Sequence, residues 1–116
     1  MDEDKNQLGE LSESISKDFN KAGIPSIISK VGFDNLNELK KHLRGKISEL
    51  LDNDYEKLIS ILYRIDVDED KLNELFGSKS RESIPGRLAD LIIERQLQKI
   101  NIRNMYAKER KNLPGK

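Results

Sequence analysis

Residues 85–111 read PGRLADLIIERQLQKINIRNMYAKERK, and this stretch has the clearest pattern in the chain. At 100° per residue, its apolar side chains form two groups on roughly opposite sides of one long helix. The first group is Leu88, Leu91, Ile92, Ile102 and Tyr106, and the second is Ala89, Ile93, Leu97 and Ile100. Pro85 fits the first helical position, where the amide hydrogen that proline lacks has no partner. The stretch predicts a helix that the rest of the chain covers on one side and a partner covers on the other.

Two sets of residues on this helix are the predicted contacts. The apolar interface set is Ile93, Leu97 and Ile100. The basic set, for an acidic partner surface or for nucleic acid, is Arg95, Lys99, Arg103, Lys108, Arg110 and Lys111. Cations spaced along a helix can neutralise phosphates, and they can equally form a solvated face near a helix C-terminus. The residues alone leave these readings open.

Before residue 85, apolar residues recur at three- and four-residue spacing, which is typical of amphipathic helices. The predicted helices are residues 8–22, 36–51, 54–65 and 68–76, with a short helical turn at 25–31. Asp34, Asn53 and Asp68 are the predicted N-caps, because a side-chain oxygen there accepts from the free amides of the first turn. Gly77 is the predicted left-handed residue at the end of the fourth helix.

The fold class follows from this pattern. No segment alternates between apolar and polar residues long enough to predict a β-strand. The 116 residues are the size of one domain. We therefore predict an all-α single domain over residues 1–116, a compact bundle of about five helices with a long C-terminal helix. Residues 1–6 and 112–116 are expected to fray.

Composition narrows the functional classes. The chain has no cysteine, which excludes disulfides and thiolate metal sites and fits a reducing compartment. No apolar run approaches the roughly 20 residues of a membrane span, and the MDEDKNQ start is unlike a signal peptide. We predict a cytoplasmic protein that has no membrane partner.

The net charge of zero conceals an uneven distribution. Residues 1–80 contain 12 basic and 17 acidic side chains, whereas residues 81–116 contain 9 and 4. A basic end of this kind can attract a polyanion, or it can lie on the acidic body of a second copy.

Three features resemble parts of metal-binding or phosphate-binding sites, and each lacks residues that such a site requires. Asp66 to Asp70 resembles the start of a calcium loop, but Lys71 and Gly77 stand where a glycine and a bidentate glutamate are required. His42 has no second histidine or cysteine with which to bind a metal. The run from Gly77 to Ser80 lacks the spacing of a phosphate loop. We predict no catalytic residue, metal, cofactor or small-molecule substrate.

A helix-turn-helix formed by residues 54–65 and 68–76 is a further alternative. Its second helix would have to enter the major groove, yet the side chains expected to be exposed there are Glu69, Asp70, Asn73 and Glu74. DNA phosphates would repel these carboxylates, which argues against this docking mode.

Two strings carry a resemblance: LYRIDVDEDKL at residues 62–72 and ADLIIERQLQKI at residues 89–100. Over about residues 54–111, the chain resembles a group of small uncharacterised bacterial all-helical proteins. The resemblance implies a bacterial cytoplasmic protein, and it brings no activity, cofactor or catalytic residue. From the two apolar sides of the C-terminal helix we predict a non-enzymatic protein-interaction module whose partner is a second copy, in a homodimer or other homo-oligomer formed through that helix, or another protein. The alternative is a nucleic-acid-binding regulator that uses the basic part of that helix.

Overall fold

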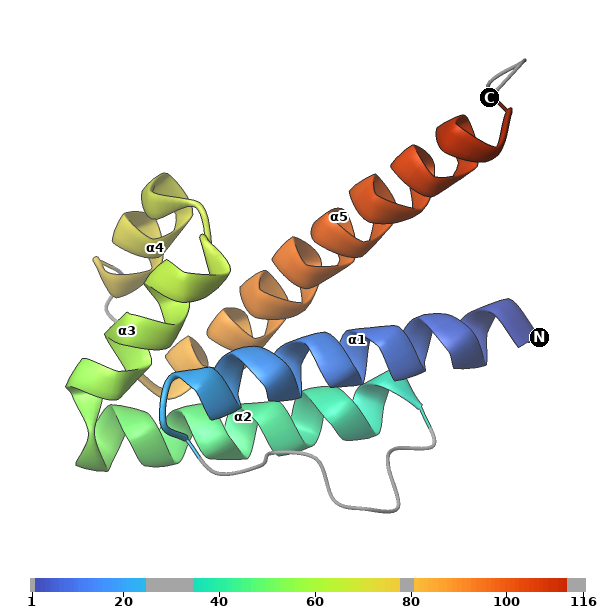
Figure 1. Ribbon diagram of the computed structural model, residues 1–116. Coiled ribbons are helices and arrows are strands. Elements are labelled where there is room, and N and C mark those ends of the chain that lie inside the picture. The colour runs from blue at the N-terminus through green and yellow to red at the C-terminus, as the bar shows by residue number, and fades with distance from the viewer. Residues whose placement is uncertain (1, 25–34, 78–80, 113–116) are drawn as a thin grey trace.

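The computed structural model describes residues 2–24, 35–77 and 81–112, and within these ranges it describes side chains from residue 7 to residue 107. The described elements are all helical (Figure 1): α1 Asp2–Lys21, α2 Leu36–Asn53, α3 Tyr55–Ile65, α4 Glu69–Phe76, a 3-10 turn at Arg81–Ser83, and α5 Ile84–Asn112. The predicted all-α bundle with a long C-terminal helix is confirmed. The short turn predicted at 25–31, and the cap predicted at Asp34, lie outside the described residues.

Two helix starts differ from the prediction by one residue. The N-cap of α2 is Asn35, whose side-chain oxygen accepts from the Glu38 amide at 2.9 Å. The N-cap of α3 is Asp54, whose carboxylate accepts from the Lys57 amide at 3.2 Å. Asn53 was therefore the wrong choice. Adjacent Asn and Asp side chains are equally able to cap, so the backbone turn decides between them.

The connection from α3 to α4 contains one residue in a left-handed conformation. Asp66 ends α3 with φ 65°, and its amide donates to the carbonyls of Leu62 and Tyr63. Asp68 then caps α4 by accepting from the Asp70 amide at 2.9 Å, as predicted. Gly77 follows α4, but its φ of −78° is right-handed, so the left-handed prediction for it was wrong.

The core lies where α5 crosses the other helices. The first half of α5 packs against α1, α2 and α3, and its second half extends away from α3 and α4 (Figure 1). The fully buried side chains include Ile15, Phe19, Leu39, Leu43, Ile47, Leu58, Ile61, Ile65, Leu88 and Ile92. Burial of this apolar surface provides most of the driving force for folding. Within the described residues, no helix is both long enough and apolar enough to cross a membrane.

Candidate functional site

The predicted apolar interface set does not lie on the surface. Ile93 is 7% exposed and Ile100 is 1% exposed within a single chain, and Leu97 is half-buried against the same core. This burial leaves Ile93 and Ile100 almost no surface in the single chain with which to contact a partner. Both apolar sides of the first half of α5 are covered by the chain itself, since Leu88 and Ile92 of one group and Ala89 and Ile93 of the other are all buried, and α1, α2 and α3 all contact α5.

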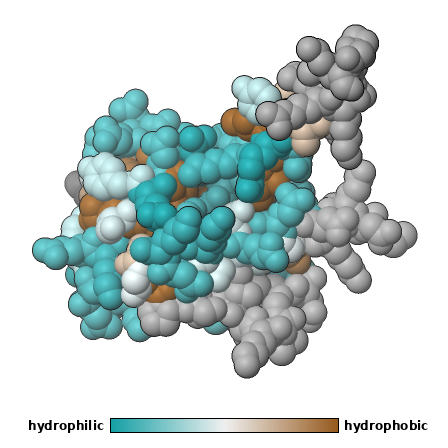
Figure 2. Space-filling view, in the orientation of Figure 1, coloured by the Kyte–Doolittle hydropathy of each residue, from teal (hydrophilic) through white to brown (hydrophobic). Residues whose placement is uncertain are grey.

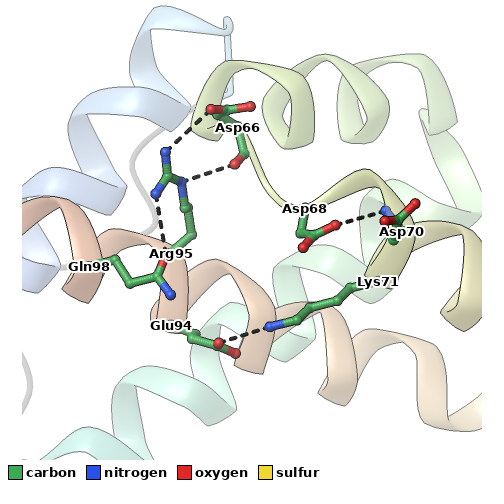
Figure 3. A network of polar contacts seen from close by, with 7 residues as sticks. All are labelled: Asp66, Asp68, Asp70, Lys71, Glu94, Arg95 and Gln98. Carbon is green, nitrogen blue, oxygen red and sulfur yellow. Dashed lines mark hydrogen bonds and ion pairs between the residues drawn. The ribbon is translucent and has the colours of Figure 1, made fainter.

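Arg95 is held by the corner between α3 and α4. Its Nε donates to the backbone carbonyl of Asp66 at 3.0 Å, and its Nη2 lies 3.3 Å from the Asp66 carboxylate (Figure 3). Nη1 donates to the Oε1 of Gln98 at 3.2 Å. Arg95 thus satisfies a carbonyl at the C-terminus of α3, where helical partners are missing. Within the single chain, its charge is paired with Asp66.

A second contact joins α4 to α5 beside the first. The Lys71 Nζ donates to the Glu94 Oε1 at 3.0 Å (Figure 3). The hydrogen bond that Lys71 donates to Glu94, together with the negative charge of Glu94, raises the pKa of Lys71 above its ordinary value. Both side chains are about half exposed, so the pair orients α4 more than it stabilises the fold.

These contacts line a small hollow between α4 and α5. Its volume is about 70 Å³, and its lining residues are Val67, Asp68, Lys71, Leu91, Glu94, Arg95 and Gln98. Ligand sites for small molecules usually have about 300–1,000 Å³. The described part of the chain also contains no group of three or more His, Cys, Asp or Glu side chains that could hold a metal. His42 is exposed on α2, as expected for a position off the apolar stripe.

A buried polar contact joins α1 to α5, and the sequence pattern did not reveal it. Gln96 is only 2% exposed, and its Nε2 donates to the Asp18 Oδ2 at 2.6 Å. Asp18 also lies 3.6 Å from the Nε of Arg64 on α3. The available signal was the spacing of Gln96, four residues from both Ile92 and Ile100, which places it on a buried stripe.

The second half of α5 is different, because its described side chains from 101 to 107 are all exposed. Ile102, Met105 and Tyr106 are 49%, 62% and 65% exposed. Their three- and four-residue spacing puts them on one face of the helix, and we call these three residues the apolar stripe. Figure 2 shows apolar atoms among hydrophilic neighbours on this projecting part, next to the grey end of the chain.

The predicted basic residues fall into three situations. Arg95 is engaged with Asp66, and Arg103 donates from Nη2 to the Ser14 Oγ of α1 at 3.3 Å. Lys99 is half-buried. The side chains of Lys108, Arg110 and Lys111 lie outside the described residues, although their backbone continues α5. The described basic residues thus do not form one continuous surface.

Comparisons with known protein families, curated proteins and solved structures find no match for this chain. The resemblance to small bacterial helical proteins remains a prediction.

Arg95→Ala is expected to lower the free energy of unfolding by about 1–2 kcal/mol, because it removes a charged donor from the Asp66 carbonyl. Urea unfolding followed by circular dichroism would measure the change. Arg103→Ala is the matched control and should cost less than about 0.5 kcal/mol, since its exposed side chain makes a single 3.3 Å contact with Ser14. Equal losses for the two variants would contradict the special role of Arg95.

Proposed function

We propose that this chain is a non-enzymatic protein-interaction module of the cytoplasm that self-associates through the projecting half of α5. One observation carries the proposal: α5 continues beyond the bundle with the apolar stripe exposed. Water-exposed apolar side chains that are aligned on one helical face are the usual anchors for a partner helix.

The proposed surface differs from the interface set predicted from the sequence. It lies on the same helix but further along, and on the face that carries Ile102 and Tyr106 instead of Ile93 and Ile100. Three apolar side chains form a small contact, so we expect a transient association with a Kd of roughly micromolar or weaker.

Ile102→Glu is expected to weaken self-association at least about tenfold, because a carboxylate would have to lose water at the centre of the stripe. Sedimentation equilibrium over a wide range of protein concentration would measure this loss. The fold should remain intact, since Ile102 is half exposed in the single chain.

The matched control for this test is Asn104→Glu. Asn104 is exposed on the same half of α5 but lies on a different face, so the same charge there should leave the association constant within about twofold. A wild-type chain that remains monomeric at the highest concentration would refute self-association. If Ile102→Glu and Asn104→Glu weakened self-association equally, the assignment of the interface to the apolar stripe would be refuted.

Nucleic-acid binding is the second candidate, favoured by the charge of the helix end. Five of the six charged residues from Lys99 to Lys111 are basic. Against it, Arg95 is engaged within the fold, and acidic residues of α4 border the same helix. Titration of a generic DNA duplex and a generic RNA at several salt concentrations separates the two functions, because phosphate contacts require affinity to fall steeply with salt.

A further inference from the structure

The outer side of α3 carries a second row of apolar and aromatic side chains. Tyr55, Ile59 and Tyr63 follow one another at four-residue spacing, which aligns them along one face of the helix. Tyr55 is 50% exposed, Tyr63 is 68% exposed, and Ile59 between them is partly buried. Phe76 of α4 extends the row, because its ring meets the Tyr55 ring edge-on with 6.3 Å between the ring centres. We call these four residues the aromatic row.

The basic side chains of α3 and α4 are all engaged with other parts of the bundle. Lys57 donates from Nζ to the Gly23 carbonyl, which follows α1, at 3.3 Å. The Nε of Arg64 lies 3.6 Å from the Asp18 carboxylate of α1. Lys71 is paired with α5, as described above. The positive charges of these two helices are therefore used on the sides that face α1 and α5.

The acidic side chains of the same two helices are exposed and have no ion pair with any described residue. They are Glu56, Glu69, Asp70 and Glu74. Glu56 lies three residues before Ile59, and Glu69 lies seven residues before Phe76, so each stands on the side of its helix that carries the aromatic row. The surface around the row is therefore negative, and the carboxylates on it are available to a cation.

Exposed tyrosine rings beside available carboxylates are suited to bind arginine or lysine. A cation is attracted to the face of an aromatic ring, and a guanidinium can also stack on the ring. A neighbouring carboxylate adds a charge-assisted hydrogen bond. The aliphatic part of the basic side chain packs on apolar surface such as that of Ile59. The same negative surface repels the phosphates of a nucleic acid.

We infer that the aromatic row is a docking surface for a basic helical segment of another protein, whose cations lie over the rings of Tyr55 and Tyr63. These residues are eight positions apart, or about 12 Å along α3, which matches two basic residues about two turns apart on a partner helix. The inference goes beyond the proposed function, because it concerns a different surface and a different partner. The row belongs to α3 and α4, and the projecting half of α5 extends away from both helices (Figure 1).

The test measures binding of a labelled alanine-based helical peptide that carries arginine at three- and four-residue spacing. Fluorescence anisotropy at low salt should give a Kd of roughly 100 μM or tighter for the full chain. A peptide with glutamate in place of arginine should not bind. Tyr63→Ala should weaken binding of the arginine peptide by about threefold to fivefold, because one ring is lost. Glu56→Gln with Glu69→Gln should weaken it by at least about threefold.

Matched controls make the same changes away from the aromatic row. Tyr106→Ala removes a ring that is 65% exposed on the projecting half of α5, and it should leave peptide binding within about twofold. Glu10→Gln with Glu13→Gln on α1 removes two exposed carboxylates and should also have little effect. Tyr63→Phe keeps the ring and should retain most of the affinity. Circular dichroism checks that every variant is folded.

The outcomes separate this inference from the proposed function. Failure of the arginine peptide to bind the wild-type chain, or equal binding of the glutamate peptide, would refute the basic partner and leave self-association through the apolar stripe intact. Equal losses in Tyr63→Ala and Tyr106→Ala would overturn the assignment to the aromatic row. If Tyr63→Ala weakened self-association in sedimentation equilibrium, the occupant of the row would be a second copy, and the assignment to another protein would be wrong.

Discussion

Ile100→Glu is expected to lower the melting temperature by about 15 °C or more. Ile100 is 1% exposed and belongs to the buried cluster that α5 forms with the other helices. A carboxylate in this apolar environment must either take up a proton or open the core to water, and such substitutions cost about 4 kcal/mol or more. In a domain of this size, each kcal/mol changes the melting temperature by roughly 4 °C.

The matched variant two residues further along, Ile102→Glu, should change the melting temperature by no more than about 2 °C, because its side chain is half exposed. Thermal unfolding followed by circular dichroism at low protein concentration gives both values. Similar losses in both variants would show that the projecting half of α5 is packed in the single chain. A stable Ile100→Glu chain that no longer self-associates would restore Ile100 to an interface.

The helices could be predicted from the sequence because their apolar spacing is local information. The stripe of Leu39, Leu43 and Ile47 identifies α2 without knowledge of its neighbours, and these three residues are indeed buried. The exact caps were less predictable. Asn53 and Asp54 are adjacent, both are able to cap, and the structure uses Asp54.

The left-handed conformation predicted at the end of α4 is wrong, and the one at the end of α3 was not predicted. Glycine adopts positive φ at no steric cost, so Gly77 was the natural prediction for α4, yet its φ is −78°. Among the described residues, Asp66 at the end of α3 is the non-glycine residue with positive φ, at 65°. The contact between Arg95 and the Asp66 carbonyl accompanies this conformation, and it joins residues 29 positions apart. The pattern of neighbouring residues in the sequence cannot reveal a contact between residues so far apart in the chain.

The apolar contact residues predicted on α5 are mostly buried within the single chain. Periodicity showed that α5 has two apolar sides, yet it could not show how many sides the remaining helices cover. In the structure they cover both sides of the first half, which buries Ile93 and Ile100. The exposed residues that remain, Ile102 and Tyr106, fall in the same spacing group as the buried Leu88 and Ile92. Which residues of this group are buried depends on how far the neighbouring helices extend along α5, and the local spacing of apolar residues does not contain that information.

The contact between Gln96 and Asp18 is a buried polar contact between α1 and α5, and its removal is the second change for which we expect a large effect. Gln96 is 2% exposed, so its side-chain amide depends on the Asp18 carboxylate at 2.6 Å. Among the described residues, no buried side-chain nitrogen or oxygen is left without a partner. Removal of Asp18 would therefore create an unpaired buried donor where none exists now.

Asp18→Ala is expected to lower the free energy of unfolding by about 2–3 kcal/mol, because a buried amide that has lost its acceptor keeps the full cost of leaving water. Gln96→Leu should cost only about 1 kcal/mol, since Asp18 keeps partial access to water and its contact with Arg64. The double variant should recover most of the loss of Asp18→Ala, because the buried amide is gone, and urea unfolding of all four chains gives the coupling energy.

Arg64→Ala, which removes only the 3.6 Å ion pair, is the control and should cost less than about 1 kcal/mol. Additive losses in the double variant would mean that Gln96 does not depend on Asp18.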